Sequence, residues 1–414
     1  MLSEKNIGKK INDNIFNTSA RAKEAAKVFG KENVINGTIG SLFDENEKLA
    51  TYEVVENVFR NLDSEDLFAY ASSFIGEKDF LEEVKKTVLG ENYKKNLSNL
   101  YFDSISTPGG TGAITSTIKN YLDHENKVLV PNLMWGSYKN IILEHEGKPE
   151  LYNLIDENQN FDIENLKQHI ENISAKQRNT IIIVNDPCHN PTGMRLTYEE
   201  WKKLFEILKE ACKKTNIILI RDVAYFEYDT RTEDEIEKIN LLMKDIPKNL
   251  LVVFTFSLSK SMSMYGLRIG AQIAVSSSKE IIDEFHNAAA FTARVTWSNT
   301  CKGGMKTFTK IMSDETLKQK YFAEKKKYIT MLNERAEIFT RESRECNLDI
   351  FPYKSGFFIT IQLGEKVDEI MNELEKNNIF GIKFGNAIRI GLCSIPKRKV
   401  KGLAKRIKKI IENF

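Results

Sequence analysis

Five uninterrupted apolar runs, each rich in β-branched residues, constrain the fold of this chain more than any other feature. Runs without alternating polar residues are typical of strands buried on both faces, as in a parallel sheet covered by helices. Amphipathic stretches lie between the runs and predict those covering helices. The sequence therefore predicts an α/β fold with a mostly parallel sheet flanked by helices. The five predicted strands are Lys127–Pro131, Thr180–Asn185, Asn216–Ile220, Leu250–Phe256 and Gly270–Val275.

The two ends of the chain differ in texture from this middle part. Residues 1 to about 35 predict an arm followed by a short helix in SARAKEAAKVF. After about residue 315, a lysine-rich helical stretch precedes short strands in FFITIQL, IFGIKF and AIRIGLC, and Lys397–Phe414 predicts a basic amphipathic helix. At 414 residues the chain exceeds one average core, so a large and a small domain are expected. The predicted boundaries are 1–50 for the arm and part of a small α+β domain, 51–315 for the large domain and 316–414 for the rest of the small domain.

Composition excludes several classes of partner. A net charge of +2 provides no general attraction to nucleic acid or to anionic membranes. No apolar run approaches the roughly 20 residues needed to span a bilayer, and the polar N-terminus does not resemble a signal peptide. The 5 cysteines form no C-x-x-C pair and the 5 histidines no H-E-x-x-H, which argues against disulfides and metal sites. We therefore expect a cytoplasmic protein without a metal, nucleic-acid or membrane partner.

Polar residues follow three of the predicted strands directly. TIIIVN leads into DPCHNPTG, which contains Asn190; NIILI leads into RDVAY, with Asp222 and Tyr225; LLVVFTF leads into SLSK, with Lys260. Parallel strands end at one edge of a sheet, where ligands bind, so we expect these side chains to meet. Each has a simpler interpretation as a turn or cap residue, but four turn residues converging on one edge are harder to explain.

Lys260 is the candidate reactive group. An ordinary lysine, with a pKa of about 10.4, is protonated at neutral pH. Beside another cation, such as Arg268, it can lose its proton and form a Schiff base with an aldehyde. Cys188 and His189 are a weaker candidate pair, because neighbours in an extended segment point to opposite sides.

The glycines in TPGGTGA precede a predicted helix, Ala113–Leu122, and suit a phosphate bound at a helix N-terminus. The segment lacks the Lys-Ser/Thr of a P-loop, and Thr115 replaces the third glycine of a dinucleotide fingerprint. The residues predicted to hold a small phosphate are Gly110, Thr111, Ser257 and Arg268.

The motifs D-x-x-x-N-P-T-G, D-x-x-Y and S-x-S-K-x-x-x-x-x-x-x-R together resemble those of class I, fold-type I pyridoxal-phosphate aminotransferases, most closely the aspartate and aromatic enzymes. The resemblance runs from about Ile35 to the C-terminus. It implies that Lys260 holds pyridoxal 5′-phosphate (PLP) and carries the substrate proton, while Asp222 binds the ring nitrogen. The residues that the resemblance adds around the ring are Asn190 and Tyr225 at its hydroxyl, Trp135 and Ala224 at its two faces, and Tyr70 at the partner subunit's phosphate.

The same resemblance implies two arginines for a carboxylate substrate. Arg389 matches the arginine that binds the α-carboxylate, and Arg294 the one that reaches a distal carboxylate from the neighbouring subunit. Each has a simpler reading, Arg389 as a structural ion pair and Arg294 as a solvated surface residue. Gly40 matches a position that contacts the substrate, as do Trp135 and Asn190. A homodimer with shared active sites follows if Tyr70 and Arg294 cross between chains.

The resemblance predicts a transaminase that moves the amino group of a dicarboxylic or aromatic L-amino acid to a 2-oxo acid such as 2-oxoglutarate, by a ping-pong route. Alternatives are another fold-type I enzyme, such as a lyase, racemase or decarboxylase, and a PLP-binding regulator. About 35 residues precede the match, too few for the DNA-binding module of such a regulator. Tyr138 replaces a histidine and Trp297 a tyrosine of aspartate-type enzymes, so the amino donor stays open.

Overall fold

The computed structural model describes residues 1–2, 6–9 and 14–414; the parts of the predicted arm at 3–5 and 10–13 lie outside the described residues. The chain divides into two compact units. The larger unit comprises Ala50–Met331 and Pro352–Gly356, and the smaller comprises Met1–Leu49, Leu332–Phe351 and Phe357–Phe414.

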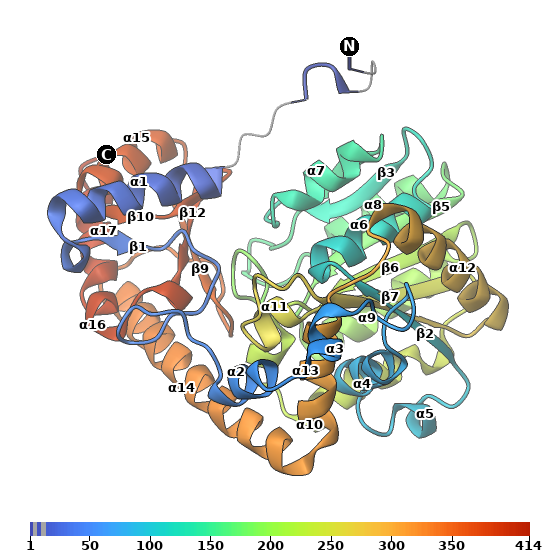
Figure 1. Cartoon of the computed structure of the whole chain (residues 1–414). Helices are drawn as coiled ribbons and strands as arrows, with labels where there is room; N and C mark the ends of the chain where they lie inside the picture. The colour runs from blue at the N-terminus through green and yellow to red at the C-terminus, as the bar shows by residue number, and fades with distance from the viewer. Residues whose placement is uncertain (3–5, 10–13) are drawn as a thin grey trace. The chain divides into compact units, whose positions relative to one another are not determined.

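The larger unit is built on a seven-stranded sheet of order β2-β8-β7-β6-β5-β3-β4 (Figure 1). Every neighbouring pair is parallel except those of β8, which runs antiparallel to β2 and β7. The predicted α/β fold is confirmed. The strands are β2 (Tyr101–Thr107), β3 (Lys127–Pro131), β4 (Lys148–Tyr152), β5 (Asn179–Asn185), β6 (Asn216–Asp222), β7 (Leu250–Ser257) and β8 (Gly270–Ser276).

All five predicted runs are strands, with ends shifted by no more than two residues. The sequence did not reveal β2 and β4, which form the two edges of the sheet. Their sequences, YFDSIST and KPELY, mix polar and apolar residues because each edge strand is partly exposed. An uninterrupted apolar run identifies only the strands that are covered on both faces.

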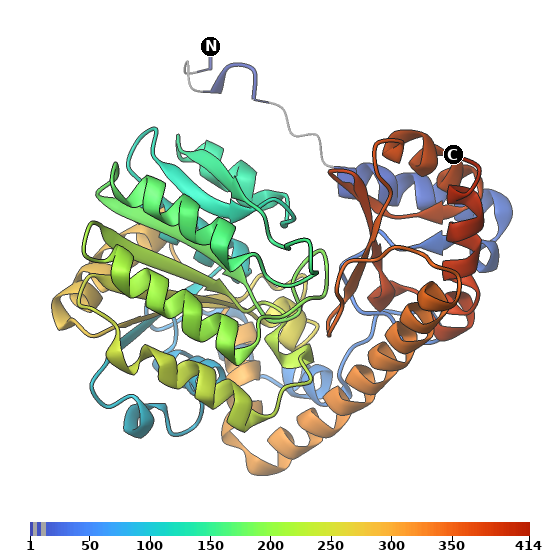
Figure 2. The same cartoon turned by 180° about the vertical axis from the view of Figure 1, so that it is seen from behind.

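Alternate residues of the central strands enter separate cores on the two faces of the sheet. Ile181 and Ile183 of β5 join the core beneath α6 (Gly109–Tyr121), α7 (Ser137–Glu144) and α12 (Lys279–Thr296). Ile182 and Val184 join the opposite core, beneath α4 (Lys78–Leu89), α8 (Ile163–Ser174), α9 (Tyr198–Ala211) and α13 (Lys302–Ser313). Figure 1 looks onto the face with α6, α7 and α12, and Figure 2 onto the face where α8 and α9 lie in green.

Local signals set the ends of several helices. The predicted capping box of α9 is confirmed. The Thr197 side chain accepts a hydrogen bond from the Glu200 backbone N–H, and the Glu200 side chain accepts one from the Thr197 backbone N–H. Helix α6 begins at Gly109, four residues earlier than predicted, so its glycines form the first helical turn. The predicted C-terminal helix is interrupted at Gly402 (φ 78°), which separates α16 (Lys397–Val400) from α17 (Leu403–Ile411).

The smaller unit contains two small sheets and helices from both ends of the chain. Strand β1 (Ile35–Asn36) pairs in parallel with β10 (Ile379–Phe380), and an antiparallel sheet has the order β11-β12-β9. Helix α14 (Glu315–Glu345) begins in the larger unit and ends in the smaller one. The other elements of this unit are β9 (Phe358–Gln362), β11 (Ile382–Phe384), β12 (Ala387–Gly391), α1 (Asn14–Phe29) and α15 (Val367–Lys376).

Short helices complete the larger unit. They are α2 (Glu53–Arg60), α3 (Ser64–Phe68), α5 (Tyr93–Asn96), α10 (Glu233–Leu241) and α11 (Leu258–Ser261). In the part of the chain that the structure describes, no helix combines the length and apolar character needed to cross a membrane.

Candidate active site

The segments that follow β3, β5, β6 and β7 surround a pocket of about 210 Å³ in the larger unit. Because β8 is antiparallel to β7, it starts at the edge where β7 ends, and Arg268, two residues before β8, also reaches the pocket. The predicted cofactor residues that line it are Gly110, Thr111, Trp135, Asn190, Asp222, Ala224, Tyr225, Ser257, Lys260 and Arg268.

Asp222, the last residue of β6, places a buried carboxyl group in this pocket with 6% of its surface exposed. One carboxylate oxygen accepts a hydrogen bond from the Tyr138 hydroxyl, and the other accepts from the Ala224 backbone at 3.0 Å. Burial raises the pKa of Asp222, while the hydrogen bonds from Tyr138 and Ala224 oppose that rise. Tyr138 and the Ala224 backbone thus favour the ionised carboxylate, whereas burial favours the neutral acid.

The Lys260 amine lies between two aromatic rings. Its Nζ is 5.3 Å from the ring centre of Tyr225 and 4.9 Å from that of Tyr265. Two tyrosine hydroxyls hold the backbone of its short helix, α11: Tyr228 donates to the Lys260 carbonyl at 3.1 Å and Tyr321 to the Ser261 carbonyl at 2.7 Å. Two buried tyrosine side chains therefore hold the backbone segment that carries the Lys260 amine.

The first turn of α6 and Arg268 form an anion-binding corner. Arg268 Nη1 donates to Ser259 Oγ at 3.0 Å and to the Tyr265 carbonyl at 2.9 Å. A Cβ atom on Gly109 would lie 2.7 Å from Arg268 Nη2. The close approach of the guanidinium to the start of α6 therefore requires glycine at this position. Backbone N–H groups, a hydroxyl and a guanidinium suit a phosphate group.

An asparagine that the sequence analysis did not single out connects two loops of the site. Asn185 ends β5; its Oδ1 accepts from the Asn190 backbone at 2.8 Å and its Nδ2 donates to the Asp222 carbonyl at 2.9 Å. The signal was present, because an asparagine closes the apolar run TIIIVN. The further lining residues that were not predicted as site residues are Ile114, Tyr138, Asn185, Ser259 and Tyr265.

Cys188 and His189 do not form a thiol–imidazole pair. The Cys188 sulfur lies 3.3 Å from Ser355 Oγ, whereas His189 Nδ1 lies 2.9 Å from Thr192 Oγ1. Burial raises the pKa of the Cys188 thiol well above its ordinary value and lowers the pKa of His189 to about 3. Both side chains are neutral at pH 7, which does not suit nucleophilic catalysis.

The predicted substrate arginines lie outside this pocket. Arg389, in β12 of the smaller unit, is 2% exposed, donates to the Thr38 carbonyl at 3.0 Å and lies 4.2 Å above the Phe358 ring. Gly40 follows Thr38 in the same unit. Arg294, in the last turn of α12, is exposed and donates to Ser298 Oγ at 2.7 Å.

Tyr70 is likewise on the surface of the larger unit, with 85% of its side chain exposed. The next residue, Ala71, accepts a hydrogen bond from Asn299 Nδ2 at 3.3 Å, which ties the Tyr70 segment to the segment after α12.

Comparison with known proteins identifies the family. Residues 32–407 match the family described as aminotransferase class I and II. This chain belongs to that family. The aminotransferase is 24% identical to the aromatic-amino-acid aminotransferase of Paracoccus denitrificans over 84% of this chain and 85% of the relative. It is 23% identical to the aspartate aminotransferase of Haemophilus influenzae, over 94% and 96%.

A solved structure is more similar still. The crystal structure of an aminotransferase from Anaerococcus prevotii superposes with a TM-score of 0.93 and 32% identity, covering 99% of this chain and 98% of that one. The protein is thus a PLP-dependent transaminase of the aspartate and aromatic type.

Proposed function

We propose that this aminotransferase transfers the amino group of a dicarboxylic or aromatic L-amino acid to a 2-oxo acid such as 2-oxoglutarate, by a ping-pong route. The observation that carries the proposal is the pocket that combines the Lys260 amine, the buried Asp222 carboxyl and the anion-binding corner at Gly110 and Arg268. These residues fit PLP, because the glycine at position 109 leaves room for Arg268 beside the helix start.

Each predicted lining residue then has a role toward the cofactor. Asp222 would hold a proton on the ring nitrogen, and Asn190 and Tyr225 would bind the ring hydroxyl. Trp135 and Ala224 would pack on the two faces of the ring. The residues assigned to the phosphate are Gly110, Thr111, Ser257 and Arg268, with Tyr70 of a neighbouring subunit.

When bound, PLP supplies an electron sink for the negative charge that develops at the substrate Cα. Lys260 Nζ would take up the proton from the substrate Cα, so the amine must be unprotonated during that step. The aromatic rings of Tyr225 and Tyr265, near the amine, limit its access to water.

Arg389 would bind the substrate α-carboxylate through its planar fork, with Gly40 beside it. Its guanidinium is buried against an aromatic ring and held at Thr38, which fixes its orientation. Arg294 would reach the distal carboxylate of a dicarboxylic substrate bound to the neighbouring subunit.

We also propose a homodimer that works in the cytoplasm. In this proposal residues 51–315 form the PLP-binding domain, and residues 1–50 and 316–414 the small domain. The exposed Tyr70 and Arg294 support shared active sites, since both roles require a second chain. Five free cysteines support a reducing compartment.

A panel of amino donors with 2-oxoglutarate tests the proposal. Without an acceptor, aspartate, phenylalanine and tyrosine are each expected to convert bound PLP to its amine form with release of one equivalent of the matching 2-oxo acid. Addition of 2-oxoglutarate should then restore PLP and release one equivalent of glutamate. Lys260→Ala should abolish turnover. Release of carbon dioxide or ammonia in place of the 2-oxo acid would instead favour a decarboxylase or a lyase.

A further inference from the structure

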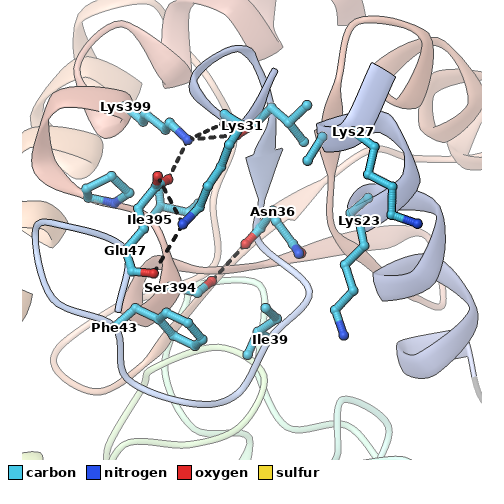
Figure 3. A pocket seen from close by; sticks show the side chains of 14 residues that line it. Lys23, Lys27, Lys31, Asn36, Ile39, Phe43, Glu47, Ser394, Ile395 and Lys399 are labelled. Carbon is cyan, nitrogen blue, oxygen red and sulfur yellow. Dashed lines mark hydrogen bonds and ion pairs between the residues drawn. The ribbon is translucent and has the colours of Figure 1, made fainter. Parts of the chain in front are cut away.

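The smaller unit holds a second pocket, of about 370 Å³, none of whose lining residues line the pocket around Lys260 (Figure 3). Helix α1, the segment from Lys31 to Glu47 and the segment from Ser394 to Lys399 form its walls. Two of its apolar residues, Ile39 and Phe43, remain only half-buried. The apolar lining residues are Ala22, Ala26, Val34, Ile39, Phe43, Ile395 and Pro396.

The charged lining is strongly cationic. Four lysines face a single carboxylate, that of Glu47. Glu47 is already shared: it pairs with the buried Lys399, lies 3.6 Å from Lys31 Nζ and accepts from Arg398 at 3.1 Å. Three cations outside α1 therefore already share its charge.

The two lysines on α1 differ in their partners. Lys27 pairs with Glu24 at 2.8 Å on the helix surface. Lys23, within the described part of the chain, makes no hydrogen bond or ion pair. Figure 3 shows both side chains on the α1 side of the pocket, opposite Glu47. This side therefore carries a positive charge that the protein itself does not neutralise.

Asn36 adds a directed hydrogen-bond donor. Its Oδ1 accepts from the Thr38 backbone at 3.2 Å and from Thr38 Oγ1 at 2.6 Å. Because a backbone N–H can only donate, the atom facing Thr38 is the oxygen, and Nδ2 is the atom left for the pocket. Figure 3 shows this nitrogen turned toward α1.

We propose that this pocket binds a small organic carboxylate with an apolar body. The carboxylate would lie at Lys23 and Asn36 Nδ2, and the body against Ile39 and Phe43. Charge complementarity favours an anion, and the half-buried apolar wall favours a ligand with hydrocarbon to bury. The volume lies within the range of sites for small molecules.

Two hydrogen bonds connect Asn36 to Arg389, the residue proposed to bind the substrate carboxylate. Asn36 holds Thr38, and the Thr38 carbonyl accepts from Arg389 at 3.0 Å. A ligand bound at Asn36 is therefore expected to change KM for the carboxylate substrate more than kcat. This consequence rests on the proposed role of Arg389, whereas the binding site does not.

The test uses the PLP-loaded protein, isoleucine methyl NMR and calorimetric titration, with octanoate as the probe and saturating 2-oxoglutarate to occupy the catalytic site. Octanoate should bind one site and shift the methyl signals of Ile39 and Ile395, leaving that of Ile181 in the sheet unchanged. Octylamine, octanol and inorganic phosphate, which lack the charge or the apolar body, should bind far more weakly.

Variants localise the site. Lys23→Glu should weaken octanoate binding roughly fivefold or more, because one attractive charge becomes repulsive. Ala26→Phe should block the pocket. Lys202→Glu, an exposed lysine on α9, is the matched control and should bind octanoate as the parent protein does.

Three results would overturn the binding site: unchanged affinity in Lys23→Glu, equal binding of octylamine, or octanoate binding that saturating 2-oxoglutarate removes. Binding without any change in KM would leave the site in place and reject the link to Arg389. Absence of transaminase activity would reject the proposed function without affecting the titration.

Discussion

Asp222 and Tyr138 show how single residues set the chemistry of the catalytic pocket. Burial alone would favour the neutral acid at position 222, and the hydroxyl of Tyr138 restores part of the preference for the carboxylate. Burial and the neighbouring Asp222 also raise the pKa of Tyr138 well above its ordinary value, so Tyr138 remains a donor. The resemblance to aspartate-type enzymes implies a histidine at this position, where this chain has Tyr138.

Tyr138→Phe is expected to move the acidic limb of the kcat/KM profile to higher pH by about one unit. The hydrogen bond stabilises the carboxylate, so its loss raises the pKa of Asp222, and the ionised form required for activity appears only at higher pH. The pH dependence of kcat/KM provides the measurement. Tyr152→Phe, which removes another buried hydroxyl, should leave the limb in place. An unmoved limb in Tyr138→Phe would reject the role of this hydrogen bond.

Gly109→Ala is expected to weaken PLP binding by roughly tenfold or more, because a left-handed φ of 72° is strained for alanine and its Cβ displaces Arg268. The dissociation constant of PLP, measured by fluorescence or absorbance, is the test. Gly136→Ala meets no atom within 4 Å and serves as the control. Equal PLP affinity in both variants would contradict the crowding at Arg268.

Arg294→Ala tests the distal carboxylate. If the arginine binds that group, the variant should lose about 2 kcal/mol or more of transition-state binding with aspartate and retain phenylalanine as a donor. Steady-state kcat/KM for the two donors gives the comparison. Similar losses for both donors, or none for aspartate, would exclude the role.

At the scale of elements, helix α14 supports the short helix that carries Lys260. A helix of four residues cannot satisfy its own carbonyl groups. Tyr228 and Tyr321 do so for Lys260 and Ser261, and Lys325, one turn after Tyr321 on α14, binds the buried Glu227. Burial lowers the pKa of Lys325 to about 8 despite the attraction of Glu227.

Lys325→Met should lower the free energy of unfolding by about 3–5 kcal/mol, because it leaves the Glu227 carboxyl buried without its cation. Urea unfolding of the PLP-loaded protein measures the loss. The double variant Lys325→Met/Glu227→Gln should recover much of the stability, since neither charge then remains. Additive losses in the double variant would show that the two side chains act independently.

At the scale of the whole molecule, large apolar side chains stand exposed on the larger unit. Phe68 and Tyr70 are 84% and 85% exposed, and Phe291 and Val295 on α12 are 68% and 57% exposed. The bond between Asn299 and Ala71 joins the two segments that carry them. The large exposed apolar groups on these connected segments support the proposed interface with a second chain.

The protein is therefore expected to sediment as a dimer, and Phe291→Arg should shift it toward the monomer and reduce activity, because the proposed roles of Tyr70 and Arg294 need both chains. Analytical ultracentrifugation and kcat of the same samples provide the two readouts. Tyr198→Arg, on the exposed start of α9, should change neither. A monomeric parent enzyme with full activity would exclude shared sites.

Local patterns in the chain were sufficient to identify the buried strands, the capping box of α9 and the polar residues that close β5, β6 and β7. These features depend on neighbours in sequence: period, cap chemistry and the residue that ends an apolar run. The same patterns could not identify the edge strands, because partial exposure removes the uninterrupted apolar signal, or the break at Gly402, which lies within an amphipathic stretch.

Contacts between distant residues were decided only by the tertiary structure. The hydrogen bond from Tyr138 to Asp222, the bridge made by Asn185, and the support of Lys260 by Tyr228 and Tyr321 all join segments far apart in the chain. The hydrogen-bond partner of a hydroxyl or an amide cannot be deduced from the sequence, because folding brings together groups that lie far apart along the chain. The sequence alone thus predicted most of the residues that line the catalytic pocket, whereas the protonation and orientation of their side chains follow from the packing around them.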